Sequence, residues 1–113
     1  VYAWWNLGVQ RARAAGADAI AVLNDDVTLL PGSLAAMAEL LDDPTIGVVY
    51  PNVGRPLADG IANEGTQDTA GTFGAGGLTG FAFMFRADLG IPFDESYRWW
   101  FGDDPEGHGG IFY

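Results

Sequence analysis

The fold is decided by the stretch Ala19-Ile-Ala-Val-Leu-Asn-Asp-Asp-Val-Thr-Leu-Leu-Pro31. Its first five residues, 19–23, are all apolar, which is typical of a short strand buried on both faces. Asn24, Asp25 and Asp26 follow at once, and carboxylates cannot remain unpaired in an apolar core. We therefore expect them at the carboxyl end of the strand, where ligands bind in open α/β sheets. The alternative is a solvated turn held by local side-chain caps.

The composition fits one globular domain spanning residues 1–113. Hydrophobic residues make up 49% of the chain, enough for a packed core. No apolar run approaches the roughly 20 residues that cross a bilayer. No signal peptide is visible, and Val1 is not an initiator, so we expect the sequence to begin inside a longer protein. The absence of cysteine excludes disulfides and thiolate metal sites.

The charge of the chain is strongly one-sided. Fifteen acids face five basic residues, all of them arginine, for a net charge of −10. This balance argues against binding to nucleic acid and against unaided attraction to anionic lipid. A phosphate-bearing substrate would then need a divalent cation to bridge it to the carboxylates. The simpler reading is that the excess acids only keep the surface soluble.

Helical signals flank the central stretch on both sides. Asn6 is a candidate cap for a helix from about Leu7 to Ala15, and Gly16 is its expected stop. We expect Trp4 and Trp5, just before that helix, to pack in the core or at an interface. A second helix follows Pro31, with these expected features: caps at Thr28 or Ser33, inward-facing Leu34, Met37 and Leu41, outward-facing Glu39, Asp42 and Asp43, and a stop at Pro44.

The second half of the chain is predicted to contain two strands and one long loop. Residues 46–50 and 78–86 are apolar and favour strands, whereas residues 52–77 lack periodicity and favour a functional loop. Residues 91–104 interleave aromatic and acidic side chains. Aromatics beside carboxylates favour a general base because they exclude water. The alternative for this segment is a surface helix whose aromatic face packs on the core.

Taken in order, these segments resemble a family 2 glycosyltransferase of the inverting GT-A type, such as the rhamnosyl- and galactofuranosyltransferases. The resemblance covers nearly the whole chain and depends on the order and spacing of short motifs. The matching segments are Asn6-Leu-Gly8 with Ala12, Ala21-Val-Leu-Asn-Asp-Asp26-Val, Pro31-Gly to Asp43-Pro-Thr-Ile-Gly-Val-Val, Gly80-Phe-Ala-Phe-Met-Phe-Arg86, Phe93-Asp-Glu95 and Phe101-Gly-Asp-Asp104.

The resemblance implies an α/β fold, namely part of a Rossmann-like GT-A domain with a mainly parallel sheet flanked by helices. It also implies transfer of a sugar from a nucleotide-diphosphate donor to a hydroxyl of a glycan or lipid-linked acceptor, with inversion. Asp26, assisted by Asn24 or Asp25, would hold Mg²⁺ or Mn²⁺ against the diphosphate. The resemblance also implies that the protein is cytoplasmic, or alternatively peripheral at the inner face of the membrane.

The remaining roles come from the end of the chain. Asp104 would be the catalytic base, with adjacent Asp103 the alternative. Trp99 and Trp100 would stack on an acceptor sugar, and core packing is an equal reading. Glu95 is a further acceptor-site or base candidate. A histidine serves as a metal ligand in some GT-A enzymes, which makes His108 a candidate; a lone histidine among glycines is more often simply exposed.

Three features depart from the family pattern. The first strands of the family, which carry many nucleotide contacts, should precede Val1. The helix expected after the base is interrupted by Pro105 to Gly110, and Asp103 replaces the usual glutamate. An inactive or incomplete fragment that binds only metal or sugar is therefore the main alternative. Exposed strand edges would also favour pairing with a second copy of the chain.

A more remote alternative is a phosphatase of the haloacid-dehalogenase type. Asn24-Asp-Asp26-Val-Thr28 superficially resembles its D-x-D-x-T loop. The first residue of that loop is the covalent nucleophile, and asparagine is a far poorer one than aspartate. No lysine is present to neutralise the phosphoryl group.

Overall fold

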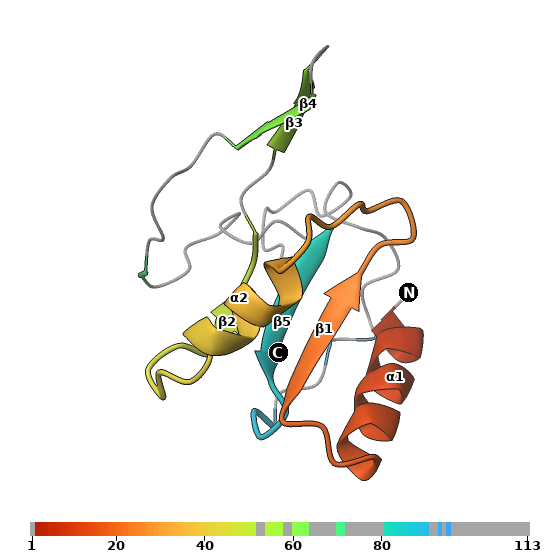
Figure 1. Cartoon of the computed structure of the whole chain (residues 1–113). Helices are drawn as coiled ribbons and strands as arrows, with labels where there is room; N and C mark the ends of the chain where they lie inside the picture. The colour runs from red at the N-terminus through yellow and green to blue at the C-terminus, as the bar shows by residue number, and fades with distance from the viewer. Residues whose placement is uncertain are drawn as a thin grey trace, which may run out of the picture.

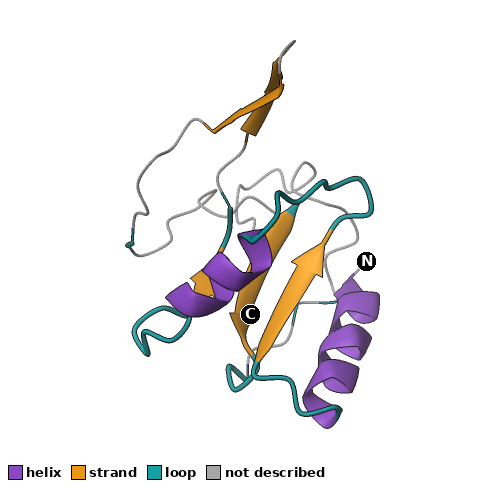
Figure 2. Cartoon of the chain, viewed as in Figure 1, coloured by secondary structure: helices purple, strands orange, loops and turns teal. Residues whose placement is uncertain are grey.

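The computed structural model describes residues 2–51, 54–57, 60–63, 70–71, 81–90, 93 and 95. Figure 1 shows the order of the elements along the chain, and Figure 2 distinguishes the helices from the strands. The elements are α1 (Tyr2–Ala14), β1 (Ala19–Leu23), α2 (Ser33–Leu40), β2 (Val48–Val49), β3 (Gly54–Leu57), β4 (Gly60–Asn63) and β5 (Ala82–Arg86). Neither helix in the described residues has the length and apolarity needed to cross a bilayer.

Strand β5 is the centre of a three-stranded sheet with the order β1-β5-β2. Both neighbours pair with it antiparallel; for example, Val22 lies opposite Phe83, and Val49 lies opposite Met84. The prediction of a mainly parallel sheet, and with it the expected partial GT-A fold, is therefore wrong. The last strand of the sheet in sequence inserts between the two earlier ones, and an apolar pattern does not reveal this order of pairing.

The side chains of β5 are buried on both faces of the sheet. Phe83 and Phe85 lie on one face in a cluster with Tyr2 and Val9 of α1, whereas Met84 lies on the other with Met37 of α2. The helices thus cover opposite faces of the central strand (Figure 1). The sequence predicted burial on both faces for β1. In that strand only Ile20 and Val22 are buried, whereas Ala21 and Leu23 are exposed, so the prediction is wrong for β1.

Helix α1 begins at Tyr2, five residues before the predicted start, so Asn6 lies inside the helix and is not its cap. Its end at Ala14 agrees with the stop expected at Gly16, which has a φ of 81°. Trp5 packs in the core as predicted, but Trp4 is 76% exposed.

Helix α2 is shorter than the predicted helix and begins without a side-chain cap. Its N-cap is Gly32 with a φ of 85°, a conformation that a residue with a Cβ rarely adopts. The expected caps, Thr28 and Ser33, are therefore wrong. Met37 and Leu41 are buried as predicted, whereas Leu34 is 43% exposed. The three acids expected to face water do so.

The predicted loop 52–77 contains a hairpin. Strands β3 and β4 pair antiparallel, with Arg55 opposite Ala62 in register. The loop prediction is wrong for these eight residues, because backbone pairing formed a strand pair where side-chain alternation gave no signal.

Substitution of Phe83 tests whether β5 is the centre of the core, because the side chain of Phe83 is fully buried. Truncation to alanine removes ring contacts with Trp5, Phe85 and Phe93 and leaves a cavity. We expect Phe83→Ala to lower the free energy of unfolding by about 3–5 kcal/mol, measured by urea denaturation. Leu34→Ala, at a half-exposed site, should lower it by less than about 1 kcal/mol. Equal losses for the two variants would show that β5 is not the centre of the core.

Candidate functional site

The acidic turn, Asn24-Asp25-Asp26, lies directly at the carboxyl end of β1, as the sequence predicted. The backbone N–H of Asn24 donates to Phe81 O at 2.9 Å, which extends the β1–β5 pairing by one bond. The N–H of Val27 then donates to Asn24 O at 3.4 Å and closes the turn. Backbone pairing therefore holds the turn in place and leaves its side chains available.

All three side chains of the acidic turn are exposed. Within the described part of the chain, the Asp25 and Asp26 carboxylates have no hydrogen-bond or ion-pair partner. The turn is therefore solvated, as the alternative expected, but no local side-chain cap is formed among these residues. Two adjacent carboxylates and one amide oxygen present hard oxygen donors to solvent from a fixed turn.

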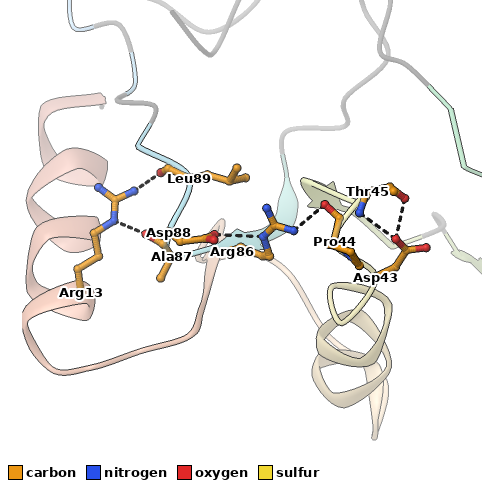
Figure 3. A network of polar contacts seen from close by, with 8 residues as sticks. All are labelled: Arg13, Asp43, Pro44, Thr45, Arg86, Ala87, Asp88 and Leu89. Atoms are coloured by element: carbon orange, nitrogen blue, oxygen red, sulfur yellow. Dashed lines mark hydrogen bonds and ion pairs between the residues drawn. The ribbon is translucent and has the colours of Figure 1, made fainter.

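Two arginines, Arg13 and Arg86, lie at the other end of the sheet. Arg13 donates through Nε to Ala87 O at 2.7 Å and through Nη2 to Leu89 O (Figure 3). Arg86 donates through Nη1 to Pro44 O at 2.8 Å and forms an ion pair with Asp88 at 3.1 Å (Figure 3). Both guanidinium groups thus bind backbone carbonyls in the turns at this end.

A third contact in Figure 3 fixes the turn after α2. The Asp43 carboxylate accepts from the Thr45 hydroxyl at 2.7 Å and from the Thr45 backbone N–H at 2.8 Å. These two bonds, the hydroxyl first, hold the pKa of the exposed Asp43 below its usual value. Asp43 is therefore a structural acid, unlike the carboxylates of the acidic turn.

The separation of the charges has a consequence for anions. Strand β1 has five residues and spans roughly 14–17 Å at about 3.4 Å per residue. This exceeds the Debye length of about 8 Å at physiological ionic strength, so Arg13 and Arg86 contribute little attraction at the acidic turn. An anion placed about 4 Å from a carboxylate there would be repelled by about 1–4 kcal/mol per charge pair. Among the side chains that the structure describes, neither Arg13 nor Arg86 offsets this repulsion at the turn.

The donor chemistry of the acidic turn fits a magnesium-type ion that is shared with a phosphate ligand. No group of three or more acidic, histidine or cysteine side chains gathers in the described residues. An all-protein cage is therefore not formed by them. Mg²⁺ commonly uses one or two carboxylates together with substrate phosphates and waters. Asp25, Asp26 and Asn24 match that partial set of ligands.

One polar cluster was missed by the sequence reading. The Asn6 side chain accepts from Phe93 N–H at 2.9 Å, donates to Phe93 O at 3.0 Å and donates to Glu95 Oε1 at 2.8 Å. An asparagine on the inner side of an apolar helix was the available signal, but it was interpreted as a cap. Its partners lie 87 and 89 residues away, and local patterns do not report such contacts.

The other predicted site residues lie outside the described residues. They are the base candidates Asp103 and Asp104, the stacking candidates Trp99 and Trp100, and the metal-ligand candidate His108. Glu95 is described and exposed, and its only assigned partner in the described structure is Asn6.

The comparisons with known proteins give no family. No family model matches the chain, and neither a curated protein nor a solved structure shows significant similarity to it.

The two arginines of α1 form a matched pair for testing the positively charged end. Arg13 is half-buried and bonded, whereas Arg11 is exposed with no partner in the described structure. We expect Arg13→Ala to lower the free energy of unfolding by about 1–2 kcal/mol, because two carbonyls lose a charged donor. Arg11→Ala makes the same charge change and should cost less than about 0.5 kcal/mol. Similar losses in urea denaturation would mean that net charge, and not carbonyl binding, is what Arg13 contributes.

Proposed function

We propose that this chain is part of a metal-dependent sugar transferase, in which the acidic turn holds a divalent cation against the diphosphate of a nucleotide-sugar donor. The observation that supports the proposal is the pair of exposed, unpartnered carboxylates on a backbone-fixed turn at the carboxyl end of β1. The distance of Arg13 and Arg86 from the turn favours a bridging metal for any phosphate there.

The order of motifs shared with family 2 glycosyltransferases supports the same chemistry. The turn follows an apolar strand, the Phe93-Asp-Glu95 segment follows β5, and the Gly-Asp-Asp104 segment comes after it. The likeness concerns these short segments and does not extend to the parallel sheet first expected from it. We therefore base the proposal on the chemistry of the turn and on the motif order.

Each residue has a defined part in the proposed transfer. Asp26, with Asn24 or Asp25, would ligate Mg²⁺ or Mn²⁺, and the bound ion would neutralise charge on the departing diphosphate. Asp104, or Asp103 in its place, would accept the proton of the acceptor hydroxyl as its oxygen attacks the anomeric carbon. The acceptor would be a glycan or a lipid-linked sugar. The acceptor sugar would stack on Trp99 and Trp100. A further ligand of the metal would be His108.

The test of the metal role is titration with UDP, GDP and dTDP by calorimetry. We expect measurable binding of at least one nucleotide with Mn²⁺ or Mg²⁺, no binding in EDTA, and a loss of at least about 10-fold in affinity for Asp26→Ala, because its carboxylate is the bridge. Asp42→Ala is the matched control, since Asp42 is an exposed acid in the turn after α2.

Two results would contradict the proposal. Equal nucleotide affinity with and without EDTA would remove the metal from the site. An equal loss of nucleotide affinity in Asp26→Ala and Asp42→Ala would show that total negative charge, and not the acidic turn, governs binding. Cation-dependent binding without any sugar transfer would instead favour the incomplete-fragment alternative.

A further inference from the structure

The side chain of Asn6 uses all of its hydrogen-bonding groups that face the 93–95 segment. Its oxygen accepts one bond, and its nitrogen donates two, to a carbonyl and to a carboxylate. Only an amide supplies both an acceptor and two donors on one planar group. A carboxylate would lack the donors, and a hydroxyl would supply a single one.

The two bonds to the Phe93 backbone imitate a strand-to-strand pairing. They hold the main chain at this residue, and the ring of Phe93 is itself buried against Tyr2, Trp5, Phe83 and Phe85. Phe93 is therefore fixed both by its backbone and by its ring. Glu95 follows two residues later and contacts the same asparagine.

The third bond acts on the Glu95 carboxylate itself. Glu95 is exposed, and an exposed glutamate normally samples many side-chain rotamers. The Asn6 amide holds Oε1 at 2.8 Å, which restricts the side chain and leaves Oε2 without a partner in the described structure. The bond to Oε1 therefore also sets the direction of the second carboxylate oxygen.

We infer that Asn6 is a positioning residue that orients Glu95, so that the second carboxylate oxygen accepts a hydrogen bond from a hydroxyl of the sugar acceptor. This role rests on the proposed sugar transfer. It adds a residue on α1 that controls the direction of the Glu95 carboxylate, which the sequence had already made an acceptor-site candidate. Hydroxyl recognition by an oriented, charged acceptor is strong because charge-assisted bonds are about twice as strong as neutral ones.

The test uses Asn6→Asp, Glu95→Gln and the double variant that combines them. Asn6→Asp places two carboxylates face to face, whereas the double variant restores a donor and an acceptor in the reverse direction. Gln10→Glu is the matched control, because Gln10 is an exposed amide one turn further along α1. Thermal unfolding reports the contact, and saturation-transfer NMR with a panel of methyl glycosides reports acceptor binding.

We expect Asn6→Asp to lower Tm by about 5 °C. The double variant should recover only the part of the shift that comes from residue 95, because the bond to Phe93 O is lost in both variants. Gln10→Glu should change Tm by less than about 2 °C. Glycoside binding should weaken at least about 10-fold in both Asn6→Asp and Glu95→Gln, and the double variant should not recover it. The double variant should therefore recover part of the Tm shift but not glycoside binding. A purely structural contact would restore or lose both together.

The outcomes distinguish this inference from the metal proposal. Additive Tm shifts without recovery would disprove the Asn6–Glu95 contact. Unchanged glycoside binding in Glu95→Gln, or no glycoside binding by the wild type, would disprove the acceptor role. The affinity of cation-dependent nucleotide binding should stay within about two-fold in every variant. Complete absence of that binding would disprove the metal site, and the Tm recovery would still test the Asn6–Glu95 contact.

Discussion

The structure depends on the need to cover β5 on both faces. This strand has hydrogen-bonded neighbours on both edges, and Phe83, Met84 and Phe85 are all buried. Burial on two faces requires a layer on each side, and α1 and α2 supply them. Since full burial of such a side chain is worth about 1.5–3 kcal/mol, this one strand contributes a large share of a small domain's stability.

The same arrangement makes the two ends of the sheet chemically different. Arg13 holds the turn after β5, and Arg86 holds the turn before β2, both through backbone carbonyls. The turn at the end of β1 is held by the backbone alone, which leaves Asp25 and Asp26 exposed. At one end of the sheet, Arg13 and Arg86 stabilise turns by binding backbone carbonyls. At the other end, the Asp25 and Asp26 carboxylates remain exposed. This division is what supports a metal-bridged phosphate in a chain with a net charge of −10.

Local patterns predicted some local features correctly, but they failed on the helix starts and on strand pairing. The apolar run before Asn24 predicted β1 and the exit of the acids, and the spacing of Met37 and Leu41 predicted the buried side of α2. The parallel sheet was wrong because strand order depends on contacts distant in sequence. Asn6 was misread for the same reason, since the residue types around it are those of a helix start while its partners lie at Phe93 and Glu95.

The most direct test of the central claim is to locate Mn²⁺ on the folded chain by paramagnetic broadening of backbone amide signals. Mn²⁺ added with a nucleoside diphosphate should broaden the signals of Asn24, Asp25 and Asp26 first. The signals of Arg13 and Ala87, across the sheet at about 15 Å or more, should broaden much less. Strongest broadening at the arginine end, or equal broadening throughout the chain, would contradict a metal-bridged diphosphate at the acidic turn.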